Sequence, residues 1–413
     1  MLVGAQHSSN KLDCLVCSHC FCYIGSIELQ IGRRLYLQAL RLSRHKETTF
    51  ESSSDHSEED CQVSDEDNNS HVTNLDKLQS ASSDTNEINL IPKEIIESLM
   101  NGGLALPYSK QFPLPSIIPC PGGCEEEHYC SKLCAEADWD LYHSLLCTGK
   151  GSSSHTEAVL KFIEHANATN DIFLLAAKAI AFTILKYRKL KSTNLIDQKR
   201  VNGMDDSSFS LLMEAWKPIS MGFKKRWWDC IALPDDIDSC NEESFRMQIK
   251  ELAFTSVQLL REAIFDKELF SLDIYGHIIG MFELNNLDLV VASPVEDYFI
   301  HIDDLPCLQK EEAEKVTRPF LDALGDDYSV CCQGTAFFPL QSCMNHSCCP
   351  NAKAFKRDED RDGQATIVAV RPIRKGEEIT ISYIDEELSY EERQALLADY
   401  GFRCQCKRCI EQV

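Results

Sequence analysis

The spacing of the cysteines constrains the fold of this 413-residue chain more than any other feature. One block, CPGGCEEEHYCSKLCAEADWDLYHSLLC, holds six residues of the types that bind metal: Cys120, Cys124, Cys130, Cys134, His143 and Cys147. His143 and Cys147 lie about one helical turn apart, so both side chains can reach one tetrahedral zinc ion. Six ligands are too many for one zinc ion and too few for two, so an earlier pair must complete the set.

Two overlapping CxxC pairs near the N-terminus can complete this set. They are Cys14 with Cys17 and Cys17 with Cys20. Either pair raises the number of ligands to the eight that two tetrahedral zinc ions need. The sequence therefore predicts a cross-braced finger with two zinc ions, and its local spacing leaves open which CxxC pair contributes.

A second group of thiols lies near the other end of the chain. The segment RCQCKRC contains Cys404, Cys406 and Cys409, and a tetrahedral zinc ion needs a fourth ligand besides these three. Cys348 in MNHSCCPN is the candidate. A zinc ion bound by these four residues would connect the C-terminus to the loop that carries Asn345 and His346.

The compartment follows from what the sequence lacks. No stretch of roughly eighteen consecutive apolar residues occurs, and the first residues do not form a secretory signal pattern. We therefore expect no membrane association and a reducing compartment, where cysteines bind metals or remain buried thiols rather than form disulfides.

The formal net charge of −24 is unevenly distributed. Residues 47–87 hold twelve Asp or Glu residues and one Lys, with few aromatic or branched apolar side chains. This composition predicts an acidic disordered insertion over 47–90. The remainder is only mildly acidic, which suits a basic peptide partner and gives no electrostatic footprint for direct DNA binding.

Periodicity divides the rest of the chain into a helical and a β-rich part. Apolar residues recur at spacings of three and four over 155–266, which predicts three or four helices, with Trp216, Trp227 and Trp228 as packing residues. After Asp273 we expect a β-rich segment. Two predicted strands with a turn at Asp362 and Gly363 occupy 352–373, and EEITISYI alternates as another strand.

A short helix follows these strands. Ser389 and Glu392 form a capping-box pattern in SYEERQALLADYGF, and Gly401 is the expected stop. The fold class predicted from these patterns is α+β.

Several motifs together resemble a known family. YCSKLC, Trp139 and HSLLC resemble a MYND finger, which implies one zinc site of Cys17, Cys20, Cys130 and Cys134 and another of Cys120, Cys124, His143 and Cys147. MNHSCCPN, GEEITISY and DYGFRCQCKRC resemble the second half of a SET domain and its post-SET zinc loop. The combination resembles the SET-and-MYND lysine methyltransferases, in particular the plant trithorax-related branch with a split finger.

The resemblance implies S-adenosylmethionine as methyl donor and three structural zinc ions, two in the finger and one in the post-SET loop. Tyr383 and Tyr400 would be the catalytic tyrosines of the lysine channel. The implied cofactor-binding residues are Asn345, His346, Phe402, Asn286 and Tyr383, and Cys348 would join Cys404, Cys406 and Cys409 on the post-SET zinc.

The resemblance also implies a β-rich SET core with a helical insertion, and a division of the chain. The expected parts are an N-terminal SET strand remnant over 1–13, the finger with its acidic insertion over 14–150, the helical insertion over 151–270, the catalytic core over 271–388, and the post-SET helix and zinc loop over 389–413.

The function implied is a protein-lysine methyltransferase that acts on a histone tail, with histone H3 as the first candidate. The implied location is the nucleus, with the cytoplasm left open, and the finger would bind transcription factors or co-regulators. A non-histone substrate shares the same site. Because no glycine-containing cofactor segment precedes the finger, the alternative is a non-catalytic zinc adaptor for transcriptional regulators.

Overall fold

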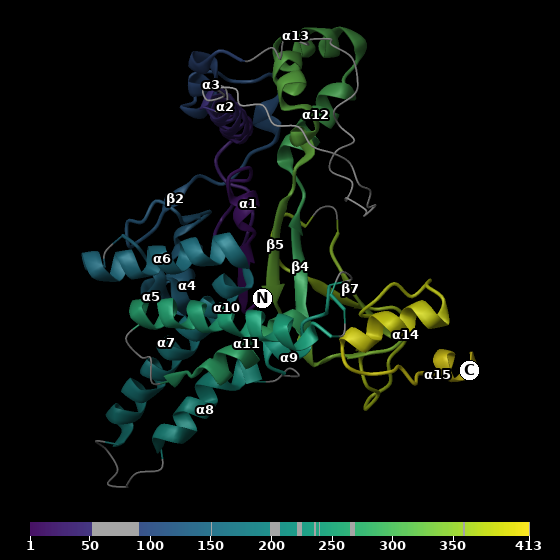
Figure 1. The fold of residues 1–413 in the computed structure, drawn as a ribbon. Coiled ribbons are helices and arrows are strands. Elements are labelled where there is room, and N and C mark those ends of the chain that lie inside the picture. Colours follow the sequence, from purple (N-terminus) through teal and green to yellow (C-terminus); the bar gives the residue numbers. More distant parts are fainter. Residues whose placement is uncertain are drawn as a thin grey trace, which may run out of the picture.

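A small antiparallel sheet forms the axis of the molecule (Figure 1). The computed structural model describes residues 1–51, 91–149, 151–198, 207–220, 225–234, 237–238, 240–264, 269–357 and 360–412. The strand order is β1 (Val3–Gln6), β5 (Cys332–Phe337) and β4 (Asn286–Val291), with β5 in the middle. Gly334 of β5 lies opposite Gln6, and a Cβ atom there would come within 2.4 Å of the Ala5 carbonyl oxygen. Only glycine lets the N-terminal strand pair so closely.

A layer of helices packs below the sheet. Its members are α6 (Ser153–Thr169), α7 (Ile172–Gln198), α8 (Ser207–Ser220), α9 (Trp227–Cys230), α10 (Glu242–Ala263) and α11 (Leu272–Asn285). Trp227 and Trp228 are buried in its apolar core, as predicted. Among the described residues of 155–266 there are five helical segments rather than the predicted three or four, because the four-residue α9 is too short to show a period.

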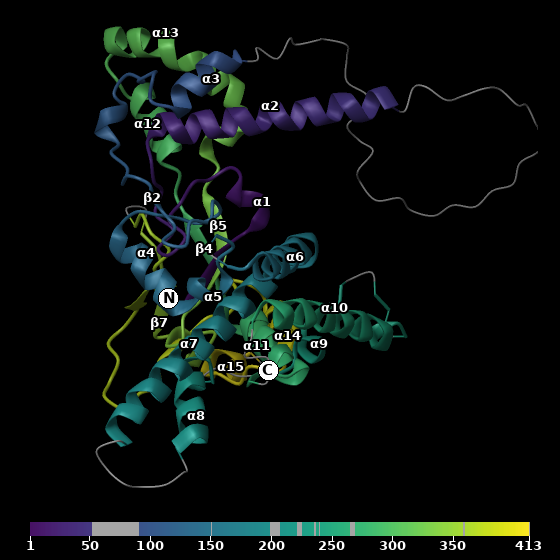
Figure 2. The ribbon, with the colours of Figure 1, turned by 90° about the vertical axis from the view of Figure 1, so that its left-hand side faces the viewer.

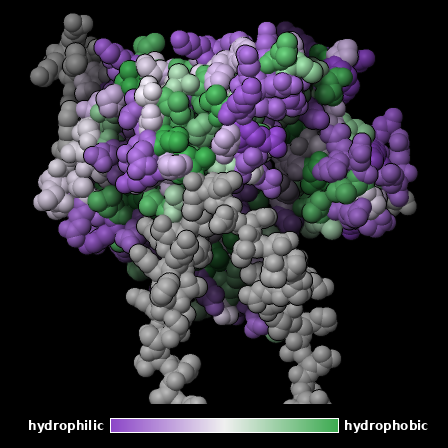
Figure 3. Space-filling view, turned by 90° about the horizontal axis from the view of Figure 1, so that it is seen from above, coloured by the Kyte–Doolittle hydropathy of each residue, from purple (hydrophilic) through white to green (hydrophobic). Residues whose placement is uncertain are grey.

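A separate group of helices, which we call the upper lobe, lies at the other end of the sheet (Figures 1 and 2). It combines α2 (Ile27–Glu51) and α3 (Lys93–Met100) with α12 (Pro294–Asp303) and α13 (Cys307–Leu324). Ile31, Leu99, Val295 and Tyr298 are among the side chains of its own apolar core. Seen from above, hydrophobic residues lie among hydrophilic ones on this end of the molecule (Figure 3).

The upper lobe corrects two expectations. The segment after Asp273 is not uniformly β-rich, because α12 and α13 lie between β4 and β5. In α12, Val295, Phe299 and Ile302 recur at helical spacing and are buried. The predicted disorder over 47–90 was also wrong at its start, since α2 continues to Glu51. Residues 52–90 of that prediction lie outside the described residues.

The finger lies beside β1. Its elements are α1 (Ser8–Lys11), a 3-10 turn (Ser109–Gln111), the paired strands β2 (Ile118–Pro119) and β3 (His128–Tyr129), α4 (Lys132–Asp138), a π-helical turn (Trp139–His143) and α5 (Ser144–Leu146). The Ser131 side chain caps α4 by accepting a hydrogen bond from the Cys134 backbone N–H. The cap fixes the start of the helix that presents Cys134.

The C-terminal region, residues 345–412, contains the remaining strands. β6 (Asn345–His346) pairs in parallel with β9 (Thr380–Ile381), and β7 (Ala352–Phe355) and β8 (Thr366–Ala369) form the predicted hairpin. Two turns, Gly325–Ser329 and Gln341–Cys343, flank β5, and the helices are α14 (Tyr390–Asp399) and α15 (Lys407–Glu411).

The predicted capping box is present at the start of α14. The Ser389 hydroxyl accepts from the Glu392 N–H, and the Glu392 carboxylate accepts from the Ser389 N–H. Gly401 follows with a φ of +83°, a backbone conformation that favours glycine. The chain therefore turns sharply from α14 into the last cysteines. Among the residues described, no helix has the length and apolar character needed to cross a bilayer.

Candidate functional site

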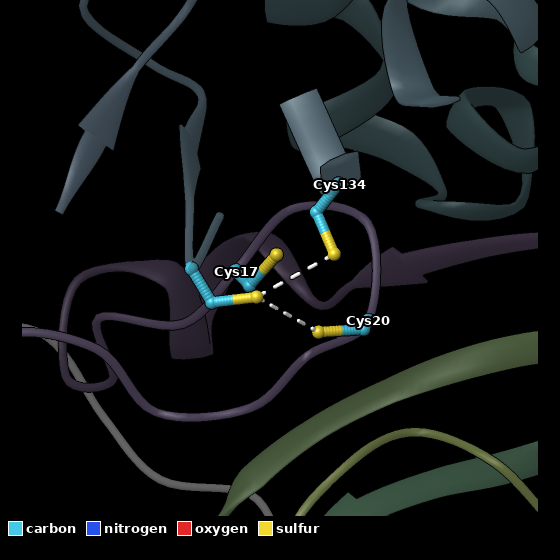
Figure 4. A group of neighbouring side chains, drawn as sticks. Cys17, Cys20 and Cys134 are labelled. Atoms are coloured by element: carbon cyan, nitrogen blue, oxygen red, sulfur yellow. Dashed lines mark hydrogen bonds between the residues drawn. The ribbon is translucent and has the colours of Figure 1, made fainter. Parts of the chain in front are cut away.

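The twelve predicted metal-binding side chains come together in three groups of four. Within each group the candidate ligand atoms all lie within 4.8 Å of one another. The first group is Cys17, Cys20, Cys130 and Cys134, the second Cys120, Cys124, His143 and Cys147, and the third Cys348, Cys404, Cys406 and Cys409. Figure 4 shows Cys17, Cys20 and Cys134 of the first group with their sulfur atoms close together. The first and third groups join segments far apart in the sequence and so close long loops, whereas the second lies within residues 120–147.

The distances fit a tetrahedral zinc ion. Zinc–sulfur bonds place two ligand sulfurs about 3.8 Å apart. The Cys130 Sγ lies 3.4 Å from the Cys134 Sγ and 3.6 Å from the Cys20 Sγ. In the second group the Cys120 Sγ is 3.7 Å from the Cys147 Sγ. Three groups of thiolate and imidazole donors at this spacing are therefore consistent with zinc sites.

The choice between the two early CxxC pairs is made by packing. Cys14 turns away from the first group, and its Sγ accepts a hydrogen bond from the Tyr23 hydroxyl at 3.2 Å. Asn10 and the buried Arg34 also approach this sulfur. Cys20 occupies the position in the metal group instead. Cys22, whose Sγ lies 3.4 Å from the Cys20 Sγ, is a neighbouring thiol that the ligand counting did not consider.

Four aromatic rings cluster beside the third group. The Tyr383 ring centroid lies 5.1 Å from that of Tyr400, 5.4 Å from that of His346 and 6.4 Å from that of Phe402. The Tyr383 hydroxyl donates to the Met344 carbonyl oxygen. Burial is the main cause that raises the pKa of Tyr383, so this hydroxyl stays protonated and can donate.

His346 connects the third metal group to Tyr383. Its Nδ1 accepts a hydrogen bond from the Tyr383 backbone N–H at 3.1 Å, and its Nε2 lies 3.3 Å from the Cys348 Sγ. Burial lowers the pKa of His346 to about 4, and nearby Arg393 adds to this effect. A neutral ring with its proton on Nε2 satisfies both contacts, so the imidazole orients Cys348 and the Tyr383 backbone together.

Two pockets meet at Tyr383. The first, which we call the Phe402 pocket, is lined by Asn345, His346, Phe402 and Tyr383, together with Thr380 and Arg403. The second, the Tyr400 pocket, is lined by Tyr383 and Tyr400 with Asn286, Asp288, Gln341 and Met344. Tyr383 therefore stands at the boundary between two separate spaces.

The predicted cofactor-binding residues divide between these pockets. Asn345, His346 and Phe402 lie together in the Phe402 pocket, where the Asn345 amide donates to the Glu378 carboxylate at 2.6 Å. Asn286 does not lie with them. It opens β4 and lines the Tyr400 pocket, as well as a third pocket with Asp171 and Glu283.

These features define a class of protein: an α+β chain with a cross-braced zinc finger and a tyrosine-centred site closed by a C-terminal cysteine group. The SET domain model matches residues 234–384, and the MYND finger model matches residues 113–147. The chain belongs to the SET-and-MYND protein-lysine methyltransferases, which confirms the resemblance and the predicted fold class.

The relatives define the branch. The chain is 64% identical over 415 residues to the histone-lysine N-methyltransferase ATXR2 of Arabidopsis thaliana, covering all of this chain and 84% of the relative. It is 25% identical over 340 residues to the protein-lysine N-trimethyltransferase SMYD5 of Gallus gallus, covering 76% of this chain and 71% of the relative. The histone-lysine N-methyltransferase set5 of Schizosaccharomyces pombe is 47% identical over 73 residues, 17% of this chain and 22% of the relative.

Membership of this family indicates the general chemistry of the reaction. A SET domain implies S-adenosylmethionine as methyl donor, and a MYND finger implies protein partners. The roles of individual site residues and the domain boundaries stay predictions.

Proposed function

We propose that this protein methylates lysine side chains of a histone tail in the nucleus, with the amine entering through the Tyr400 pocket. The observation that carries this proposal is the position of Tyr383 between the two pockets. A methyl donor on one side and an acceptor amine on the other would meet at its ring. Such an arrangement suits an in-line transfer, in which positioning supplies much of the catalysis.

The Phe402 pocket is the proposed cofactor site. The Phe402 ring is 37% exposed, which leaves an aromatic face for the adenine, and Asn345 offers a polar side chain nearby. S-adenosylmethionine, when bound, supplies an electrophilic methyl group on a sulfonium. Asn286 would contact the cofactor only from the side of the Tyr400 pocket, so its role is secondary to that of Asn345 and His346.

The Tyr400 pocket is the proposed lysine site. A lysine amine has a pKa of about 10.4 in water and must lose its proton before it can attack. Partial burial disfavours the ammonium form, and the tyrosine rings supply this environment. In the proposal, Tyr383 orients the amine and Tyr400 forms the opposite wall. Both residues touch the reacting group and are the proposed catalytic residues.

The three cysteine groups are proposed to hold structural zinc ions, two in the finger and one in the post-SET loop. Their ligand sets contain four protein side chains each and leave no open position for a reactant. The finger would bind transcription factors or co-regulators. The name of the ATXR2 relative supports a histone substrate and a nuclear location, and the H3 tail is the first candidate.

Calorimetric titration with S-adenosylmethionine tests the cofactor site. We expect micromolar binding to the zinc-loaded protein and at least about tenfold weaker binding after Asn345→Ala. Methylation of histone H3 should then be lost in Tyr383→Phe and retained in Tyr36→Phe, which changes an exposed tyrosine of α2. Absence of both binding and methylation would contradict the proposal and favour the non-catalytic adaptor.

A further inference from the structure

An unpaired acceptor lies in the Tyr400 pocket. The Gln341 side chain is 92% buried, and its Oε1 atom is buried without a hydrogen-bond partner among the residues described. A buried carbonyl oxygen without a donor is unfavourable unless a water molecule or a ligand completes it. Since Gln341 lines the same pocket as Tyr383 and Tyr400, a donor that enters this pocket can satisfy it.

The backbone holds Gln341 in a fixed relation to Tyr383. Gln341 begins a 3-10 turn, and its own carbonyl oxygen accepts from the Met344 N–H at 2.9 Å. The Met344 carbonyl oxygen in turn accepts from the Tyr383 hydroxyl. The Ser342 hydroxyl further ties the turn to the Pro339 carbonyl oxygen at 2.9 Å. Gln341 and Tyr383, which both line the pocket, therefore belong to one hydrogen-bonded piece of structure.

A carboxylate lies on the exposed side of the same pocket. Asp288 is exposed on β4, which is an edge strand of the sheet. Across the described part of the chain its carboxylate forms no hydrogen bond and no ion pair, although it lines the pocket with Gln341. An unpaired negative charge at this position attracts a cation such as a lysine ammonium.

We propose that Gln341 is a positioning and specificity-determining residue whose Oε1 accepts a hydrogen bond from the substrate lysine amine, and that Asp288 attracts the ammonium at the pocket mouth. This inference rests on the proposed function and adds which methylation states of the substrate lysine the pocket prefers. A neutral lysine amine has two N–H groups, a monomethylated amine has one, and a dimethylated amine has none. Of these neutral amines, only the first two can donate a hydrogen bond to the Gln341 Oε1.

The consequence concerns the number of methyl groups transferred. Once two methyl groups are present, the neutral amine cannot donate to Oε1, and the buried acceptor again lacks a partner. Unmethylated and monomethylated lysines are therefore the preferred acceptors, and the third transfer is the slowest. A carbonyl oxygen in the pocket distinguishes amines with an N–H group from amines without one by hydrogen bonding, whereas an apolar side chain of similar size would not.

The test compares peptides of one histone H3 sequence with unmethylated, monomethylated or dimethylated lysine. Their affinities for the full-length protein loaded with S-adenosylhomocysteine are measured together with kcat and KM for methyl transfer. We expect Gln341→Leu to lower kcat/KM for the unmethylated peptide about tenfold, because its neutral attacking amine loses the hydrogen bond to Oε1. The kcat/KM for the dimethylated peptide, whose neutral amine has no N–H, and the affinity for the cofactor should hardly change. The control is Gln309→Leu, which replaces an exposed glutamine on α13.

The outcomes separate the inference from the proposed function. Equal losses for all three peptides would show a merely structural role and overturn the inference. If Gln341→Leu fails to bind cofactor, Gln341→Glu is the variant to measure, because it keeps an acceptor oxygen. If Gln341→Glu still discriminates against the dimethylated peptide, the inference is supported. If that discrimination is lost, the inference is overturned. A wild-type protein that methylates nothing contradicts the proposed function, while peptide binding still tests Gln341.

Asp288 gives an independent measurement. Asp288→Asn should raise KM for the unmethylated peptide about threefold at low salt, with unchanged kcat, and this difference should disappear at high ionic strength. Asp304→Asn removes an exposed carboxylate from the upper lobe and serves as the matched control. A salt-independent effect would overturn the electrostatic role assigned to Asp288.

Discussion

The helical layer of α6 to α11 and the C-terminal region of residues 345–412 are held together by different means. Large apolar side chains such as Phe173, Trp227 and Phe282 fill the core of the helical layer. The buried side chains of the C-terminal cluster are Leu397 and three members of the third cysteine group, Cys348, Cys404 and Cys409. The zinc ion proposed for this group would stabilise a region that buries little apolar surface.

This difference matters because Tyr383 and Tyr400 both pack against the cysteine-based cluster rather than the helical core. With zinc bound at the third cysteine group as proposed, the positions of the proposed catalytic residues depend on that ion, while those of the helices do not. A substitution that disturbs one region should therefore leave the other region folded.

The largest effect is expected from the third cysteine group. Cys409→Ser removes one of four metal ligands, so we expect methyl transfer to fall by at least about 100-fold because the loop bearing His346 and the tyrosines loses its anchor. Far-ultraviolet circular dichroism should retain the helical signal. Cys349→Ser, at the exposed cysteine next to Cys348, is the control. An active Cys409→Ser protein without metal in this group would refute the dependence.

The next effect is expected in the helical core. Trp227 is 1% exposed, and its ring nitrogen donates to the Glu283 carboxylate at 3.1 Å. Trp227→Ala leaves a large cavity and should lower the free energy of unfolding by about 3–5 kcal/mol, measured in urea. Phe209→Ala, at a side chain that is 71% exposed, should change it little. A loss below about 1 kcal/mol would mean that this core tolerates cavities.

A smaller effect is expected at the start of α14. Ser389→Ala removes half of the capping box and should cost about 1 kcal/mol. Amide hydrogen exchange should accelerate in α14 and leave α6 and α7 unchanged, since the regions are stabilised separately. Ser220→Ala, at an exposed position in α8, is the comparison. Equal acceleration in all helices would show that the regions unfold as one unit.

The smallest effect concerns pH. Burial raises the pKa of Glu283 in the helical layer, despite the hydrogen bond from Trp227 that opposes the shift. A folded-state pKa above the unfolded value contributes stability below the unfolded pKa, and this contribution is lost as pH rises through the folded pKa. Glu283→Gln should therefore have a higher Tm than wild type at pH 7, with the difference vanishing near pH 4. A lower Tm at pH 7 would contradict this sign.

Much of the local structure could be predicted. The capping box at Ser389, the pairing of β7 with β8, and the burial of Trp227 and Trp228 follow from short-range patterns. The upper lobe could not be predicted, because α2 and α12 bury apolar faces against each other across more than two hundred residues of sequence. Periodicity indicates that a face is apolar, but it does not identify the face that covers it.

The sequence by itself determined the chemistry of the sites: the number and type of metal ligands, the motif that carries Asn345 and His346, and the tyrosines at the end of the alternating strand. Tertiary structure decided which residues meet. It placed Cys20 rather than Cys14 with the first cysteine group and separated Asn286 from the Phe402 pocket. It also left Gln341 Oε1 without a hydrogen-bond partner in the described part of the chain, in a residue that lines the same pocket as Tyr383. The physical reason is that spacing limits reach only within a few residues, whereas burial and long-range pairing depend on the whole fold.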